Sequence, residues 1–166
     1  MLNWIKAKFF EREPVFKLIE NENKTRFLIP ESCFRNLVTY LNDASTQGHE
    51  GVVLFLGKGN GETKVALQCV QPKATTTQGS FKISSAEMAK VINLATDLDL
   101  EIIAQVHTHP REAFHSKGDD EGARIRYEGY LSLVIPTMGG SCPILRAPHF
   151  MNSAKMRVGS SSRSTS

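Results

Sequence analysis

Three histidines, two adjacent aspartates and a serine lie close together in VHTHPREAFHSKGDDEGA, residues 106–123. Histidine and aspartate side chains are metal ligands, and imidazole suits zinc, copper, iron and nickel. His107 and His109 are two positions apart at the end of a predicted strand. Because side chains at i and i+2 leave the same face of a strand, the two imidazoles can grip one cation. The spacing therefore predicts a metal site.

A third ligand is needed, because a catalytic zinc takes three protein ligands and keeps a fourth position for water. Either Asp119 or Asp120, a loop beyond the histidine pair, can supply a carboxylate. These residues also have structural explanations. The two aspartates could favour the positive end of a following helix. Ser116 could cap a turn, and His115 could be a partly exposed histidine without a role.

The elements that must hold this site follow from the pattern of apolar residues. Short apolar runs bounded by turn residues predict strands over 15–19, 25–29, 52–56, 64–70, 101–107 and 131–136. Helical spacing of apolar residues predicts a helix from Pro30, which suits a first helical turn. A capping box at Ser84-x-x-Glu87 introduces a second helix, ending at Leu98. The segment 71–80, QPKATTTQGS, is polar and predicts a loop.

These elements predict a single α/β domain in which helices flank a mostly antiparallel or mixed sheet. We expect residues 1–150 to form this domain and the Ser-rich residues 151–166 to be a disordered tail. The length of 166 residues fits one domain of ordinary size.

Composition excludes several classes of protein. The formal net charge is +3, and no basic run carries interleaved aromatic residues, so nothing favours a nucleic-acid partner. Three widely spaced cysteines without a CxxC pair predict neither a disulfide framework nor a zinc ribbon. No stretch approaches the roughly 20 apolar residues of a membrane span, and the N-terminus lacks the apolar run of a signal peptide. We therefore expect a cytoplasmic protein that does not bind membranes.

The stretch HTHPREAFHSKGD resembles the signature of the JAMM (MPN+/JAB) zinc proteases, which is H-x-H-P, a short spacer and S-x-x-D. That family also carries an upstream glutamate in the form E-x-x-G before an apolar strand. HEGVVLFLGK offers Glu50, with Val53 where the family often has glycine. The spacer 111–115 is one residue shorter than in many members. From about residue 30 to 148, the order of predicted elements is similar to the MPN fold.

The resemblance implies an α+β fold of the MPN/JAB, cytidine-deaminase-like kind with one zinc ion per chain. Its ligands would be His107, His109 and Asp119, because only Asp119 fits S-x-x-D. Asp120 would point about 100° away on a helix.

The resemblance also implies two catalytic roles. Glu50 would be the general base that takes a proton from water and returns it to the leaving amine. Ser116 would donate a hydrogen bond to the oxyanion of the tetrahedral intermediate. No covalent intermediate would form.

Active members of the family cleave peptide or isopeptide bonds after the C-terminal glycine of ubiquitin or ubiquitin-like proteins, and the resemblance implies this substrate class. The substrate tail would lie extended beside a strand, with residues 72–80 and 111–115 as candidate contacts. A small domain without a ubiquitin-binding module is more similar to prokaryotic JAB proteins. Some of those are encoded beside activating (E1-like) and conjugating (E2-like) enzymes, including antiphage systems of the CBASS and Bil type.

Other functions remain open at this point. The protein could be a non-catalytic MPN scaffold, although it retains every position of the signature. The same site could act on sulfur-carrier proteins of the ThiS/MoaD type or on small amides. A thiol enzyme would use Cys69 or Cys142 with a histidine, but neither cysteine lies in a recognisable nucleophile turn. Two histidines and a carboxylate could also bind iron.

Overall fold

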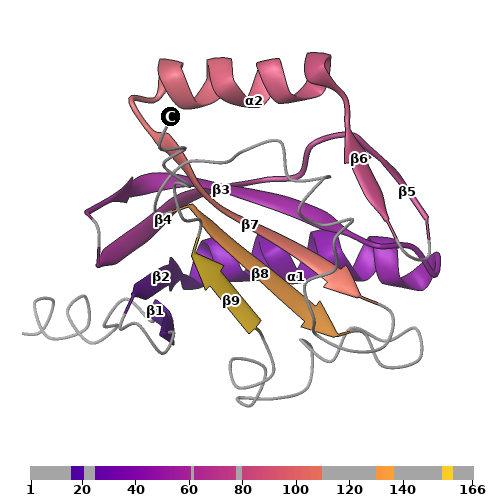
Figure 1. The fold of residues 1–166 in the computed structure, drawn as a ribbon, viewed down its shortest axis with the longest axis horizontal. Helices are drawn as coiled ribbons and strands as arrows, with labels where there is room; N and C mark the ends of the chain where they lie inside the picture. Colours follow the sequence, from indigo (N-terminus) through magenta and orange to yellow (C-terminus); the bar gives the residue numbers. More distant parts are fainter. Residues whose placement is uncertain are drawn as a thin grey trace, which may run out of the picture.

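The computed structural model describes residues 16–20, 25–60, 62–77, 80–109, 130–136 and 155–158. These residues form an α+β fold with a seven-stranded sheet, a two-stranded sheet and two helices (Figure 1). Their elements are β1 (Phe16–Glu20), β2 (Arg26–Pro30), α1 (Glu31–Thr46), β3 (Val52–Gly59), β4 (Thr63–Val70), β5 (Ala74–Thr76), β6 (Phe81–Ile83), α2 (Ser85–Asp97), β7 (Glu101–His109), β8 (Leu131–Pro136) and β9 (Lys155–Val158).

The large sheet is mixed and has the strand order β1-β2-β4-β3-β7-β8-β9. The pairs β2–β4 and β7–β8 are parallel, and the other neighbouring pairs are antiparallel. β3 and β7 lie side by side near the middle of the sheet. The predicted class, helices flanking a mixed sheet, is confirmed.

Helix α1 covers one side of the sheet. Its buried residues Cys33, Leu37 and Leu41 recur every fourth position, which places them on one face of the helix. They join a core cluster with sheet residues that include Phe27 and Phe55, whose rings meet edge to face at 5.4 Å. Full burial of a leucine or phenylalanine contributes about 1.5–3 kcal/mol, so this cluster anchors α1 to β2 and β3.

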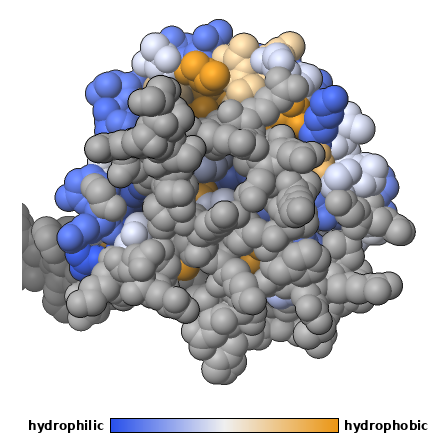
Figure 2. All heavy atoms as spheres, in the orientation of Figure 1, coloured by the Kyte–Doolittle hydropathy of each residue, from blue (hydrophilic) through white to orange (hydrophobic). Residues whose placement is uncertain are grey.

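Helix α2 belongs to a second core cluster, together with β3 and β6. It begins as the capping box predicts, because Ser84 Oγ accepts a hydrogen bond from the Glu87 backbone N–H at 3.2 Å. Met88, Val91 and Ala95 are its buried residues. Figure 2 shows apolar side chains gathered at the end of the molecule where α2 lies, and α2 and its cap leave large apolar side chains exposed there: Ile92, Leu94 and Leu98.

A bulge in β7 decides which side chains share a face. Phe55 of β3 pairs with Ala104, and Leu56 pairs with Ile102, so Ile103 is an extra residue on β7. Ile103 and Ala104 both belong to the core cluster of α1. After the bulge, alternation resumes with Val106 in that same cluster. The residues at odd positions, 105, 107 and 109, therefore leave the opposite face of the sheet.

Two sequence-based expectations need correction. The segment 71–80, predicted as a polar loop, contains β5, which pairs with β6 directly after it, from Ala74↔Ile83 to Thr76↔Phe81. Its β-branched threonines and the alternation of Phe81 and Ile83 around a lysine were a strand signal that overall polarity concealed. Within the predicted tail, Lys155–Val158 form β9 against β8. Pairing with β8 satisfies their backbone groups, an effect that composition does not register.

The helix expected after residue 119 lies outside the described residues. Among the described residues, no helix is long and apolar enough to cross a membrane.

Candidate functional site

Glu50 is held at the junction between α1 and β3. After α1 the chain turns through Gly48, whose φ of +69° suits a residue without a Cβ. The Glu50 backbone N–H then donates to the carbonyl of Thr77, which follows β5, at 2.8 Å. The residue is therefore fixed between the end of the helix and the small sheet, and it is only 2% exposed.

The start of β3 is locked to the end of β7. Val52 pairs with His107 in antiparallel register. One residue outward, the Thr108 N–H donates to the Gly51 carbonyl at 3.0 Å, and the Gly51 N–H donates to Thr108 Oγ1 at 2.8 Å. These two hydrogen bonds attach the residues just before β3 to the end of β7 that holds the histidines.

The structure brings together three of the five predicted site residues: Glu50, His107 and His109. Glu50 Oε1 lies 3.9 Å from His109 Nε2. The two imidazole rings have centroids 5.1 Å apart and are inclined by 54°. All three side chains are buried. Ser116 and Asp119 lie outside the described residues, as does Asp120, so their assignments stay predictions.

His107 has two further neighbours on its own face of the sheet. The ring of Phe81, from β6, lies 5.1 Å away between centroids. The amide Nε2 of Gln105 lies 3.4 Å from His107 Nδ1. Sequence analysis missed Gln105, although its place two residues before His107 on the same strand puts it on the same face.

The described donors include ligands that suit a transition-metal ion. Two adjacent buried imidazoles are ligands that zinc prefers, and a carboxylate lies within reach of one of them. Among the described residues, no group of three or more His, Cys, Asp or Glu side chains is arranged to hold a metal ion. A complete ligand set therefore needs a residue beyond the described ranges, and Asp119 is the predicted one.

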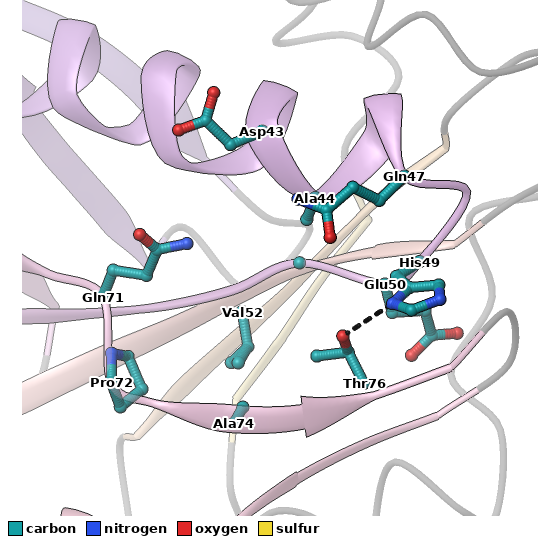
Figure 3. A pocket seen from close by; sticks show the side chains of 11 residues that line it. Asp43, Ala44, Gln47, His49, Glu50, Val52, Gln71, Pro72, Ala74 and Thr76 are labelled. Atoms are coloured by element: carbon teal, nitrogen blue, oxygen red, sulfur yellow. Dashed lines mark hydrogen bonds between the residues drawn. The ribbon is translucent and has the colours of Figure 1, made fainter.

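A pocket of about 160 Å³ opens beside Glu50 (Figure 3). It lies between the end of α1, which contributes Asp43, and the segment around β5. His49 Nδ1 and Thr76 Oγ1 lie 3.2 Å apart at its wall. The described lining has two carboxylates, from Asp43 and Glu50, and no lysine or arginine. Its chemistry suits a polar or cationic group of a substrate.

The described cysteines do not suit a thiol mechanism. Burial, with a smaller contribution from Cys33, raises the pKa of the Cys69 thiol to about 12. Burial also raises the pKa of Cys33. A nucleophilic cysteine needs a lowered pKa, so neither of these thiols is activated. Cys142 lies outside the described residues.

Comparison with known proteins identifies a relative. No family model matches the chain. A curated protein of Sinorhizobium fredii, "Probable metalloprotease y4jG", is 32% identical over 112 residues, which make up 65% of this chain and 69% of that protein. The chain belongs to the family of this probable metalloprotease. That relative is, by its name, a probable metal-dependent protease.

A solved structure shares the fold at low sequence identity. A protein from Desulfitobacterium hafniense, solved in solution, matches with a TM-score of 0.55 and 14% identity, over 78% of this chain and 79% of that one. This likeness shows a common fold. A crystal structure of a JAB1/MPN domain protein from Archaeoglobus fulgidus matches with a TM-score of 0.39 and 15% identity, over 75% of this chain and 85% of that one.

Proposed function

We propose that this protein is a JAMM-type zinc peptidase that cleaves after the C-terminus of a ubiquitin-like protein. The observation that carries the proposal is the buried group of one carboxylate and two imidazoles, with Glu50 Oε1 3.9 Å from His109 Nε2. The HTHP…SxxD signature and membership in the family of a probable metalloprotease support it.

His107, His109 and Asp119 would hold the ion. When bound, zinc would polarise the scissile carbonyl and lower the pKa of water toward ~7. Glu50 would accept the proton of the attacking water and pass it to the leaving amine. Ser116 would donate a hydrogen bond to the developing oxyanion. The burial of Glu50 shields its carboxylate from bulk water, which strengthens its interactions with the reacting groups.

The substrate tail would lie extended along the small sheet. β5 and β6 pair with each other, and Thr77 after β5 is bonded to the Glu50 backbone, so this sheet is fixed beside the site. A tail added to such an edge gains backbone hydrogen bonds. The partners of the protein would include E1-like and E2-like enzymes. An antiphage conjugation system is one setting that would supply the substrate.

The first test is metal content and cleavage by the purified chain. We expect about one zinc per chain and chelator-sensitive cleavage of ubiquitin-like fusion proteins. Glu50→Gln should keep the metal and lose about 10²–10⁴-fold in kcat, because it removes only the general base. His107→Ala combined with His109→Ala should lose the metal.

Glu62→Gln is the matched control, because it makes the same substitution at an exposed position in the turn between β3 and β4. It should match the wild type in metal content and rate. A wild-type protein that neither contains zinc nor takes it up on titration would contradict the proposal.

A further inference from the structure

Gln105 is a buried polar residue that the proposed mechanism does not use. It is 2% exposed. It lies on β7 between β3 and β8, where it pairs with Leu54 and Ser132. Its amide Nε2 lies 3.4 Å from Nδ1 of His107. Burying an amide is costly unless it makes hydrogen bonds, so this contact helps β7 to accommodate it.

The contact constrains the protons of His107. A neutral imidazole has one protonated nitrogen, which donates, and one bare nitrogen, which accepts. An amide nitrogen can only donate, so this contact is a hydrogen bond when Nδ1 accepts and the ring proton lies on Nε2. Because Gln105 contacts Nδ1, we expect His107 to bind a metal through Nε2. When His107 binds a metal through Nε2, its ring proton must lie on Nδ1, and Nδ1 then acts as a hydrogen-bond donor.

A glutamine can serve both arrangements, because its amide presents either a donor or an acceptor. Half a turn about the last side-chain bond exchanges Nε2 for Oε1 opposite the imidazole. The amide oxygen would then accept from the Nδ1 proton while Nε2 of His107 holds the ion. Hydrogen bonds of this kind orient metal-binding histidines and set their tautomer.

We propose that Gln105 is a positioning residue that sets the tautomer and ring orientation of His107, donating to Nδ1 without metal and accepting from it when zinc is held. The inference rests on the proposed function and adds a residue outside the HTHP…SxxD signature. Loss of such a bond costs about 10–100-fold in metal affinity.

The affinity test compares three variants of the full chain in competition with a chromophoric zinc chelator. Gln105→Met keeps the length of the side chain and removes its hydrogen bonds, so zinc should bind about 10–100-fold more weakly. Gln105→Glu keeps an acceptor and should bind at least as tightly as the wild type. Ser132→Ala, at the register position beside Gln105 on β8, should not change the affinity.

The second readout is the ring ¹⁵N NMR shifts of His107 in metal-free protein, which distinguish the two tautomers. The wild type should carry its proton on Nε2, and Gln105→Met should show a mixture. Gln105→Glu should carry it on Nδ1, because a carboxylate accepts and cannot donate. A purely structural role for Gln105 would not reverse the tautomer. Should Gln105→Met fail to fold, this reversal carries the test.

The outcomes separate this inference from the proposed function. Zinc binding by the wild type, with equal affinity and the same His107 tautomer in all variants, would overturn the role of Gln105 and leave the peptidase proposal standing. A wild type that binds no zinc would overturn both.

Discussion

The contact between Glu50 and His109 joins residues that are far apart in the sequence. No local pattern connects them, and the pairing of β3 with β7 brings them within 3.9 Å. A carboxylate beside an imidazole in a buried site can exchange a proton with a reacting group, because bulk water does not compete for it. The chemistry of the residue types was visible in the sequence, but their distance depended on the register of two strands.

At this scale, the state of Cys69 yields a prediction. With a pKa of about 12, only about one Cys69 thiol in ten thousand is ionised at pH 8 in the folded protein. Iodoacetamide should therefore leave Cys69 unmodified until denaturant is added, as read by peptide mass mapping. The proposed peptidase activity should persist after iodoacetamide treatment of the folded protein. Rapid modification in the folded state, with loss of activity, would revive the thiol mechanism.

The same shift has a consequence for stability. The folded-state pKa is raised above the ordinary value of 9.0, so the folded state holds this proton more tightly than the unfolded chain. The contribution to the free energy of unfolding is present below pH 9 and is lost as pH rises toward 12. Urea unfolding of the wild type and of Cys69→Ala across this window should show a smaller pH dependence in the variant.

At the scale of elements, Gly57 and Gly48 are glycine for different structural reasons. A Cβ on Gly57 would lie 2.0 Å from the carbonyl oxygen of Val65, so β3 and β4 would have to separate. A Cβ on Gly48 meets nothing within 4 Å, but its φ of +69° strains any residue with a side chain.

These reasons predict unequal costs. Gly57→Ala should lower the free energy of unfolding by about 3 kcal/mol or more, because a backbone atom cannot move aside as a side chain can. Gly48→Ala should cost about 1–2 kcal/mol, and Gly48→Asn less, because asparagine tolerates the left-handed region. Chemical denaturation measures all three. Equal costs for the two alanine variants would contradict the close approach of the strands at Gly57.

Sequence reasoning recovered the elements whose patterns are strong. The capping box at Ser84 and the apolar run of β3 gave a helix and a strand with boundaries within a few residues of those observed. It missed β5 and β6, because three-residue strands in a polar segment carry little periodicity. It also missed Gln105, although the i, i+2 spacing on a predicted strand puts this side chain on the same face as His107. The bulge that sets this face leaves no mark in composition.

At the scale of the whole molecule, metal binding should stabilise the fold. An ion held by the end of β7 and by a residue beyond the described ranges would bind the folded chain and not the unfolded one. At a free zinc concentration 100 times the dissociation constant, the gain is about 2.7 kcal/mol. The melting temperature should rise by several degrees with zinc and fall with chelator. The His107→Ala and His109→Ala double variant should show no such response.

The number of residues between the bulge and the histidines of β7 decides which face of the sheet carries the two imidazoles. Side-chain direction alternates after the bulge, so losing one residue between Ala104 and His107, with the register of the preceding residues kept, would send both imidazoles toward α1, into the apolar core. Losing the extra residue Ile103 itself would only restore regular pairing of β7 with β3. Substitutions in the stretch from Ala104 to His107 would leave the number of residues, and hence the direction of the imidazoles, unchanged. The direction of the imidazoles should therefore survive substitutions between Ala104 and His107 far better than insertions or deletions of one residue.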